Sequence, residues 1–445
     1  MPRLVSPSSK RLPHRLQTGK PSSPENLDAR PDNVLNKATN GWMALPPAQP
    51  SYILRGHASQ IHCACFIRSN KRLVSGDADG WIVIWSLDIK RPLAVWRAHE
   101  GAILGADTWG PDKLITHGKD NKLVVWRLSS EDESSLSTVL PVDTPPEPRR
   151  QPWVLHILNV NTMNFCSFAC GPAYPAPTAP PDTSDELLIA VPNTLSSETV
   201  DIFHLPTGKR IHTVPSAPGL KGGMVMAVSI FHHPQTKNLI VVAGYESGHT
   251  AISQFTMRPK SWDSRESTYT ARTSAEEQKS WQTSYLSQPH TQPLLSLSTS
   301  PDFTYYLTSS ADSVIAKHLI PSTIPTQLAL TPSQPHKINQ TKHAGQQSLR
   351  IRNDGKIFAT AGWDARVRVY GCKTLKEVAV LKWHQEGCFA VAFADVDVDV
   401  GGGDKGDSGA GKLISVKEER VRRAEKAHWI AVGSKDGKIS LWEIY

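Results

Sequence analysis

Histidine, hydroxyl and acidic residues recur together along this 445-residue chain, and they are the residue types of a nucleophilic hydrolase. In such a site the histidine takes a proton from the hydroxyl group while the acid orients the imidazole ring. Two complete groups occur, each ending in a tryptophan: His57, Ser75, Asp79 and Trp85, then His99, Thr116, Asp120 and Trp126. Any chemistry assigned to one group must therefore also account for the other.

Repetition indicates that these groups are structural rather than catalytic. A catalytic triad is a single site with an oxyanion hole and a substrate cleft, whereas this set recurs at a fixed spacing from a tryptophan. Buried hydrogen bonds among the four side chains would join the loop before a first strand to the turn between the second and third strands. Each bond would stabilise the fold by roughly 0.5–1.5 kcal/mol. We therefore expect structural tetrads and no enzyme.

A glycine-rich stretch near the C-terminus has the spacing of a phosphate-binding loop, in Gly406, Gly411 and Lys412. Leu413, however, occupies the position at which such a loop needs Ser or Thr to hold Mg²⁺. Acidic neighbours would repel a polyphosphate, and no helix signal follows directly from the lysine. We expect a linker at this position and no nucleotide cofactor.

Metal ligation is not expected either. The six cysteines match neither a zinc-site spacing nor a secreted disulfide framework, so we interpret them as small core residues in a reducing compartment. The acids between Asp395 and Asp407 lack the spacing and the final Glu of an EF-hand loop. The sequence thus predicts no metal and no other cofactor.

The charge pattern permits acidic partners without indicating a nucleic-acid site. The chain has 49 Lys and Arg against 41 Asp and Glu, a net charge of +8, but the basic residues are scattered among the acids. We expect no direct sequence-specific contact with nucleic acid. No apolar run reaches the roughly 18 residues of a membrane span, and no signal peptide is recognisable. An intracellular, soluble protein without a membrane partner is expected.

The tetrads belong to a longer repeat, for which the stretch Leu54–Trp85 is the template. A Gly-His pair precedes one strand-like run, a second run follows, and an Asp-Gly turn leads into a third run that ends in tryptophan. The interval of six residues from turn acid to closing aromatic recurs at Asp120/Trp126, Asp364/Tyr370 and Asp436/Trp442, in a degenerate form at Asp312/His318, and two further copies end near Phe203 and Phe255. Seven repeats are predicted.

A repeat of about 40 residues with a Gly-His start and a Trp-Asp-like end resembles the WD40 family, whose units are four-stranded blades around a channel. The resemblance implies an all-β, seven-bladed WD40 β-propeller over residues 51–445. Residues 1–50 are rich in Pro, Ser and basic residues and lack hydrophobic periodicity, so a disordered tail is expected there.

Several blades depart from the tetrad that the resemblance implies, and we expect them to be less stable. Blades three and four lack the histidine. The other departures are Asn159 at the histidine position of blade three, His318 and Tyr370 at the tryptophan positions of blades five and six, and Val432 at the hydroxyl position of blade seven. Blade six, from His343 to Tyr370, is otherwise expected to be regular.

The strand before the first Gly-His pair has no upstream partner. In WD40 rings such a strand closes the circle by pairing with the last blade. The resemblance therefore implies that Tyr52, Ile53 and Leu54 are the latch of the ring.

Insertions are predicted to lie on one face of the ring. In an antiparallel four-stranded blade, the loops between strands one and two and between strands three and four emerge on the same side. The insertions are Ser129–Gln151, Gly171–Ser184, Met257–Ser280, Pro321–Pro335 and Asp395–Ala427, and all five fall in such loops. We call this side the insert face and expect mobile loops there.

The opposite side, which bears the turns with the tetrad acids, is called the smooth face. Its loops are expected to be short and rigid, which suits a large protein partner. Lys119 and Lys435, beside the turn acids of blades two and seven, are the candidate contact residues.

The chain also resembles a narrower family, the fungal ASTRA-associated protein 1 family, itself similar to G-protein β-subunits. The stretches that carry this resemblance are LRGHASQIHCACFIRSNKRLVSGDADGWIVIW, LAVWRAHEGAILGADTW, LITHGKDNKLVVWRL, PWVLHILNVNTMNFCSF and WIAVGSKDGKISLWEIY. Membership implies a non-catalytic scaffold subunit of a nuclear ASTRA assembly. The implied partners are a phosphatidylinositol-kinase-related protein, its co-chaperones and RuvB-like ATPases. The implied role is in chromatin remodelling or in maturation of those kinases.

Two other functions stay open. A G-protein β-like signalling subunit is one, although such a subunit is expected to bring an N-terminal coiled-coil helix and residues 1–50 show no heptads. A propeller that reads a histone tail through its channel is the other.

Overall fold

The computed structural model of the chain describes residues 48–143, 149–161, 165–175, 186–255, 281–323, 332–397 and 415–444. The chain divides into two units, Met1–Pro46 and Pro47–Tyr445, and every described element belongs to the second. The predicted tail lies outside the described residues except for its last three, which form neither helix nor strand.

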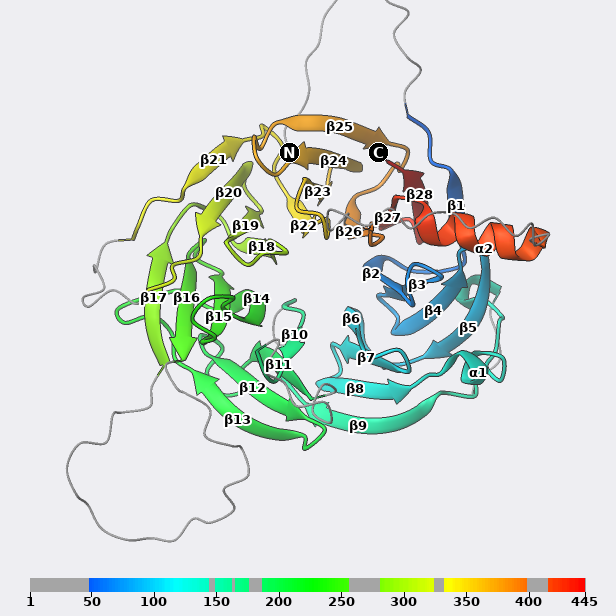
Figure 1. Cartoon of the computed structure of the whole chain (residues 1–445), viewed down its shortest axis with the longest axis horizontal. Coiled ribbons are helices and arrows are strands. Elements are labelled where there is room, and N and C mark those ends of the chain that lie inside the picture. The colour runs from blue at the N-terminus through cyan, green and yellow to red at the C-terminus, as the bar shows by residue number, and fades with distance from the viewer. Residues whose placement is uncertain are drawn as a thin grey trace, which may run out of the picture. The chain divides into compact units, whose positions relative to one another are not determined.

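The second unit consists of seven four-stranded antiparallel sheets arranged in a ring (Figure 1). In six sheets the strands follow one another in sequence order, and in the seventh the first strand of the chain completes the sheet. The predicted seven-bladed, all-β propeller is therefore confirmed. Each blade begins with its innermost strand and proceeds outward.

Blades one to three hold the strands β2 to β13. Their bounds are β2 (Ile61–Ile67), β3 (Arg72–Asp77), β4 (Trp81–Ser86), β5 (Arg91–Arg97); β6 (Ile103–Trp109), β7 (Lys113–Gly118), β8 (Lys122–Arg127), β9 (Trp153–Asn159); β10 (Ala169–Pro172), β11 (Leu187–Pro192), β12 (Val200–Leu205) and β13 (Lys209–Val214).

Blades four to six hold β14 to β25. Their bounds are β14 (Val225–His232), β15 (Leu239–Tyr245), β16 (Thr250–Phe255), β17 (Trp281–Ser287); β18 (Leu294–Thr299), β19 (Tyr305–Ser310), β20 (Val314–Leu319), β21 (Lys337–Gln340); β22 (Gln346–Ile351), β23 (Ile357–Gly362), β24 (Arg366–Gly371) and β25 (Glu377–Lys382).

Blade seven contains strands from both ends of the described chain, and the helices lie in the insertions. The remaining bounds are β26 (Cys388–Phe393), β27 (Trp429–Ser434), β28 (Lys438–Glu443) and β1 (Tyr52–Arg55), with α1 (Ser130–Glu133), the 3₁₀ turn η1 (Pro141–Asp143) and α2 (Val416–Lys426). None of the helices in the described ranges is long and apolar enough to span a membrane.

The core lies between neighbouring blades, and glycines on second strands allow the close approach. A Cβ on Gly76 would lie 2.7 Å from Ile103, the first residue of the next blade's inner strand. A Cβ on Gly433 would similarly lie 2.5 Å from Ile61 across the closing junction. Contacts this short are not tolerated in close-packed interiors, so a larger residue at either position would have to displace the isoleucine.

The ring closes through the predicted latch. Strand β1 pairs with β28 in an antiparallel register that sets Tyr52 opposite Leu441 and Leu54 opposite Ile439. Leu54 is 2 % exposed and packs in one apolar cluster with both of these partners and with Ile61 of blade one. The latch prediction is confirmed.

The first insertion, Ser129–Gln151, packs against blade one where the structure describes it. The carbonyl of Ser137 accepts a hydrogen bond of 2.7 Å from the amide of Val95 on the outer edge of β5. Glu133 of α1 is buried and forms ion pairs with Arg68 and Arg72 from blade one. The expectation of mobile loops is therefore wrong for this part of Ser129–Gln151.

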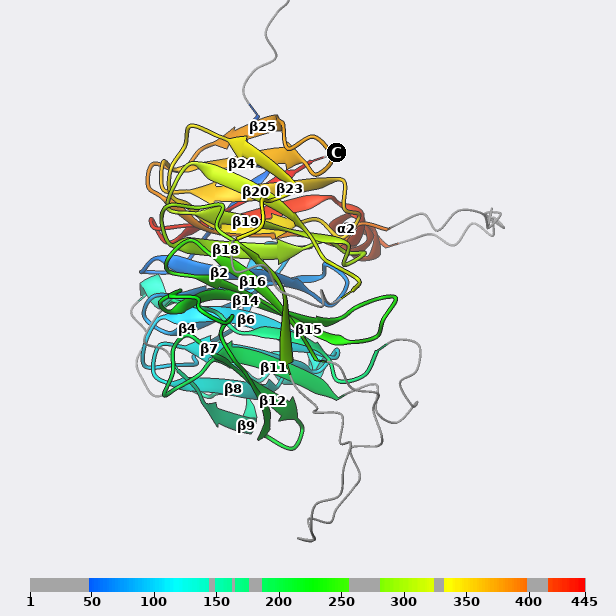
Figure 2. The same cartoon turned by 90° about the vertical axis from the view of Figure 1, so that its left-hand side faces the viewer.

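The last insertion is also anchored. A capping box between Ser415 and Glu418 begins α2 three residues beyond Lys412, a helix signal that the sequence analysis missed. Near its C-terminal end, Ala424 is 5 % exposed and accepts a hydrogen bond of 3.2 Å from the Trp429 indole. Figure 2 shows α2 on one side of the ring. Gly406, Gly411 and Lys412 themselves lie outside the described residues.

Two asparagines hold the start of this insertion between blades six and one. Asn70 exchanges two hydrogen bonds with the backbone of Asp395, at 2.7 and 2.9 Å, and its amide also donates to the carbonyl of Glu425 in α2. Asn353 exchanges two with the backbone of Val396, at 2.9 and 3.0 Å. The insertion therefore contacts the blade on each side of blade seven.

Candidate interaction surface

The tetrad of blade two has the predicted members. His99 lies with Nδ1 2.9 Å from Asp120 and Nε2 2.8 Å from the Thr116 hydroxyl, which also accepts a bond of 2.8 Å from the Trp126 indole. Burial alone would raise the pKa of Asp120, but the hydrogen bond and charge of His99 outweigh it and lower that pKa. The structure thus brings all four side chains together.

Blade one corrects one prediction, because Asp77 takes the place assigned to Asp79. His57 contacts Asp77 at 2.7 Å and Ser75 at 2.7 Å, and the Trp85 indole donates to Ser75 at 2.8 Å. The other oxygen of Asp77 accepts the backbone amides of Asp79 and Trp81.

The use of Asp77 in place of Asp79 has a geometric reason. Blade two has Gly118 at the position of Asp77, and a Cβ there would lie 2.3 Å from the His99 ring. A side chain at this position therefore starts close to the imidazole, and an acid there can bond to it. In blade one the carboxylate bonds to it, and Asp79 is left outside the group.

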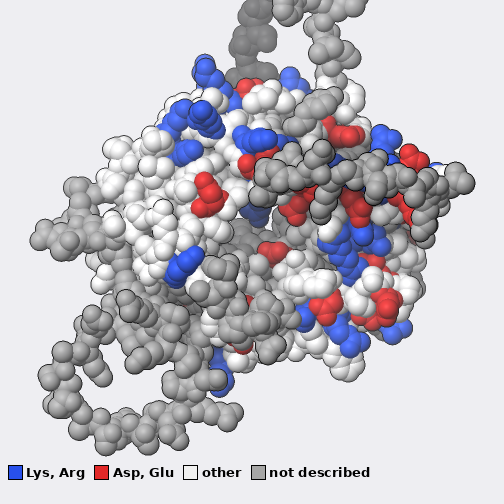
Figure 3. Space-filling view, in the orientation of Figure 1, with Lys and Arg blue, Asp and Glu red and all other residues white. Residues whose placement is uncertain are grey.

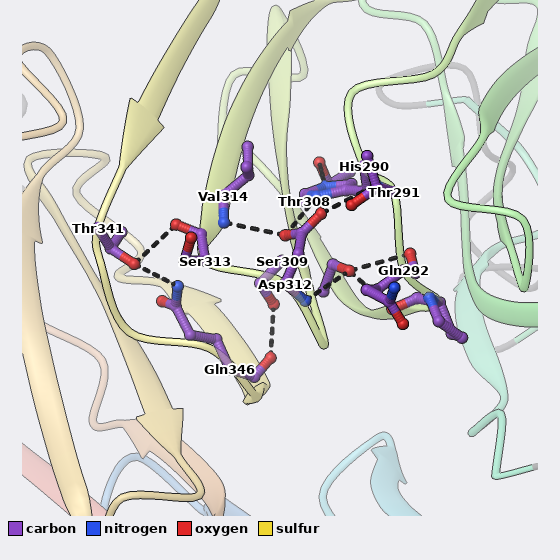
Figure 4. A network of polar contacts seen from close by, with 12 residues as sticks. His290, Thr291, Gln292, Thr308, Ser309, Asp312, Ser313, Val314, Thr341 and Gln346 are labelled. Carbon is purple, nitrogen blue, oxygen red and sulfur yellow. Dashed lines mark hydrogen bonds and ion pairs between the residues drawn. The ribbon is translucent and has the colours of Figure 1, made fainter.

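Blade five keeps the tetrad with a histidine in place of tryptophan. Figure 4 shows three of its members, His290, Thr308 and Asp312. His290 contacts Thr308 at 2.9 Å and Asp312 at 3.1 Å. His318 reaches the same hydroxyl at 3.2 Å, and its other nitrogen lies 2.9 Å from the Tyr285 hydroxyl. Burial lowers the pKa of His318 to about 3, so the ring is neutral near pH 7.

Blade seven is complete, contrary to expectation, because its hydroxyl comes from the neighbouring strand. Ser440 lies directly opposite Val432 in the β27–β28 register. Its hydroxyl contacts His384 at 2.9 Å and accepts the Trp442 indole at 2.8 Å. His384 lies 3.4 Å from Asp436.

Blade six, expected to be regular, replaces its histidine with an arginine. Arg368 is 2 % exposed and forms two bonds with Asp364, at 2.6 and 3.2 Å. It lies opposite Thr360, as Ser440 lies opposite Val432. His343 is only half-buried and belongs to no such group.

Blade three uses a buried acid at the corresponding position. Asp201 is 2 % exposed and accepts bonds from the Asn193 amide at 2.9 Å and from the Thr213 hydroxyl at 2.6 Å. Asn159 is exposed at the end of β9, whereas the buried Asn161 donates to the carbonyl of Asn193 at 2.6 Å. The assignment of Asn159 to the histidine position was therefore wrong.

One signal would have revealed these substitutes. Each substitute lies two residues before the closing aromatic, where blades one and two have a buried valine: Asp201 before Phe203, Arg368 before Tyr370 and Ser440 before Trp442. A polar residue at this otherwise apolar position indicates that the third strand supplies the polar group.

The groups are placed for structure rather than for reaction. Ser75 and Thr116 are 0 % exposed, so no substrate reaches their hydroxyls. Among the described residues, no three His, Cys, Asp or Glu side chains converge as potential metal ligands. The buried hydrogen bonds instead hold the turns of the smooth face in place.

The predicted contact lysines both lie in turns between second and third strands. Lys119 has its ammonium 3.9 Å from the ring centre of Phe165, a cation–π contact. Lys435 lies 3.9 Å from the Glu386 carboxylate, with both side chains half-exposed. Blade one separates these lysines along the ring.

Large apolar side chains accompany them on the smooth face. Phe165 is 59 % exposed in the loop before β10, Leu195 is 95 % exposed in the turn between β11 and β12, and Trp363 is 48 % exposed in the turn between β23 and β24. Asn193 holds the Leu195 turn by accepting the amides of Leu195 and Ser196.

A cavity of about 500 Å³ opens at the centre of the ring. Phe165 and Trp363 are at its edge together with Phe389, and His62 and Arg350 contribute its ionisable side chains. Among the described residues that line it there is no acid. On the insert face, by contrast, basic and acidic side chains are interspersed (Figure 3).

Comparison with known sequences gives one consistent result. The profile of a family described as ASTRA-associated protein 1 matches residues 50–391. The chain is 51 % identical over 405 residues to ASTRA-associated protein 1 of Verticillium alfalfae, covering 89 % of this chain and 93 % of that protein. It is 32 % identical over 422 residues to ASTRA-associated protein 1 of Schizosaccharomyces pombe, covering 89 % of this chain and 99 % of that protein.

Proposed function

Because the chain belongs to the ASTRA-associated protein 1 family, we propose that it is a non-catalytic scaffold subunit of a nuclear ASTRA-type complex. Its role would be in chromatin remodelling or in maturation of phosphatidylinositol-kinase-related proteins. The observation that carries the proposal is the match to relatives of this name over 89 % of the chain.

The partners would be a phosphatidylinositol-kinase-related protein, its co-chaperones and RuvB-like ATPases. The smooth face suits a large partner, because most of its strand-connecting turns are short and buried hydrogen bonds hold them. Phe165, Leu195 and Trp363 offer exposed apolar anchors, and Lys119 and Lys435 add charge beside them. Aromatic and aliphatic anchors within a polar surround are the usual sources of binding energy at protein interfaces.

The histone-tail alternative for the channel, which would place a segment rich in Lys and Arg there, has less support. The described lining of the central cavity has Arg350 and His62 but no carboxylate to pair with a basic peptide. Electrostatic complementarity therefore disfavours a basic ligand there. The signalling alternative has no specific contact in its favour.

Affinity purification of the tagged full-length chain tests the proposal. The wild type is expected to co-purify kinase-related and co-chaperone polypeptides, whereas a G-protein γ-like chain would contradict the proposal. The double variant Lys119→Glu/Lys435→Glu should lose most of these partners. Lys209→Glu, an exposed lysine in the outer strand of blade three, is the matched control and should keep them.

A further inference from the structure

The outermost strand of blade two differs from the other blade edges. Strand β9 contains no Lys, Arg, Asp or Glu, and it exposes Trp153 by 70 %, Ile157 by 55 % and Val154 by 37 %. Edge strands of soluble proteins are normally protected by charge or by a covering segment. The other outermost strand without charge, β17, keeps its large apolar side chains at least partly buried.

The neighbouring blade shows how such an edge is covered in this fold. On the outside of β5, the backbone carbonyl of Ser137 accepts the amide of Val95, so a segment of the chain itself covers that edge. Among the described residues no backbone bond from outside the sheet reaches Trp153–Asn159. Figure 1 shows β9 on the outside of blade two. Within the described part of the chain, its outer edge therefore has no pairing strand.

A groove lies beside this edge, between blades one and two, with a volume of about 370 Å³. Val154 and Ile157 form one wall, and Trp81 of blade one lines the groove with them. The guanidinium of Arg149 covers the Trp81 ring at 4.6 Å. An extended chain lying along β9 would therefore bury apolar side chains on the groove side.

Cationic side chains flank the apolar strand at both ends. In the β8–β9 register, Lys122 lies opposite Asn159 and Arg127 lies opposite Trp153. Lys122 is exposed, and the Arg127 side chain is 57 % exposed with Asp132 at 3.8 Å. The groove is lined by the acids Glu100 and Asp120 as well as by Arg97, Lys122 and Arg149, so its cations outnumber its acids. This arrangement favours an occupant that is apolar in its middle and acidic at its ends.

We propose that β9 is a docking edge that binds an extended partner segment, apolar in its centre with flanking Asp or Glu residues, by addition of a strand. Main-chain hydrogen bonds would supply affinity and the groove would supply side-chain selectivity, as in other strand-addition complexes. The proposal does not depend on the smooth face or on the proposed function.

The probe for this proposal is a phage-displayed library of random twelve-residue peptides, selected on the full-length chain. The enriched peptides are expected to carry alternating apolar residues with Asp or Glu beside them. On binding, hydrogen exchange should slow at the amides of Trp153–Asn159. Affinity should fall by roughly tenfold or more in Ile157→Lys, because an exposed apolar contact is replaced by a charge.

Matched variants separate the edge from general effects. Val378→Lys, at a residue 68 % exposed on the outer strand β25, should bind the selected peptides as the wild type does. If Ile157→Lys lowers the melting temperature of the chain, Trp153→Ser is the edge variant to use in its place. Lys122→Glu/Arg127→Glu should weaken binding and reduce its dependence on salt.

Several results would overturn the proposal. The first is that peptides are not enriched above a heat-denatured control. The others are that both edge variants bind the peptides as tightly as the wild type, that the enriched peptides lack acids, or that binding protects amides elsewhere in the ring. A wild-type dimer in sedimentation that Ile157→Lys converts to monomer would assign the edge to a second copy of the chain instead.

Discussion

His57 and Asp77 lie 2.7 Å apart, and both side chains are almost fully buried. The same carboxylate accepts two backbone amides of the following turn, so a single acid joins the loop before blade one to the turn between its second and third strands. The geometry of the smooth face at blade one depends on this pair.

Asp77→Ala should therefore destabilise the ring, because it leaves His57 and the turn amides without their acceptor. The expected loss is about 1–3 kcal/mol, the usual cost of an unpaired buried polar group. Asp79→Ala removes no side-chain bond of the tetrad and should change stability by no more than about 0.5 kcal/mol. Urea denaturation measures both, and equal shifts of the midpoints would contradict the assignment of Asp77.

The position of the hydroxyl group in blade seven can be tested by moving it. Ser440→Ala leaves His384 and Trp442 without a shared partner and should cost about 1–3 kcal/mol. The double variant Val432→Thr/Ser440→Val restores the arrangement of blade two and should recover most of that loss. If the double variant is no more stable than Ser440→Ala, the two positions are not interchangeable.

The latch predicts a sharp boundary for N-terminal truncation. Removing residues 1–55 deletes β1 and should lower the melting temperature of the whole ring, because β28 loses its partner and Leu54 leaves the core. Removing residues 1–45 leaves β1 intact and should have no effect. Equal melting temperatures for the two truncations would exclude the latch.

His117 gives stability a predictable pH dependence. Its ring is 0 % exposed, and neither nitrogen has a hydrogen bond within the described structure. Burial, reinforced by the charge of His99, lowers the pKa of His117 to about 3. The unfolded state binds a proton near pH 6.5, so it binds more protons than the folded state between these values. Stability therefore falls as the pH decreases through about 6.5.

His117→Leu should stabilise the ring by about 1 kcal/mol or more near pH 7.5, because it removes two unpaired buried polar atoms. It should also remove about 1 kcal/mol of the stability lost between about pH 7.5 and about pH 5.5. Denaturation midpoints at the two pH values measure both effects. An unchanged pH slope would show that His117 does not carry this proton linkage.

The insertion in blade seven should divide into a dispensable and a required part. Replacing residues 398–414 with a short Gly-Ser linker should leave stability unchanged. Ala424→Arg should destabilise the ring, because Ala424 packs in the cluster that contains Leu54 and Trp429. Arg420→Ala, at an exposed residue of α2, is the control, and a loss as large as that of Ala424→Arg would contradict the docking of the helix.

The repeat period and the alternation of apolar residues determined the strands and the blade count, and the resemblance to WD40 rings implied the latch. These patterns are local, and a shift of one residue would move a strand's apolar side chains to the wrong side. The sequence also determined the tetrad of blade two, since each of its positions holds the usual residue type.

Tertiary structure alone decided which atom fills each polar position. Asp77 replaces Asp79 from two residues earlier in the chain, whereas Arg368 replaces His343 and Ser440 replaces Val432 from a different strand. A hydrogen bond depends on where an atom lies, and different segments can place an atom at the same point. Alignment by the spacing of the tetrad alone misses such exchanges across a strand pair, although a polar residue two positions before the closing aromatic indicates them.

The docking of the insertions was likewise decided by the fold. Ser137 reaches Val95, and Asn70 reaches Asp395, across large separations in sequence. The composition of these segments, rich in Pro, Ser, Gly and charged residues, indicated only that they are loops. Only the folded ring brings the edge of β5 and the turn at Asn70 close to these insertions. Backbone groups of the insertions that would otherwise bond to water then find partners in the protein.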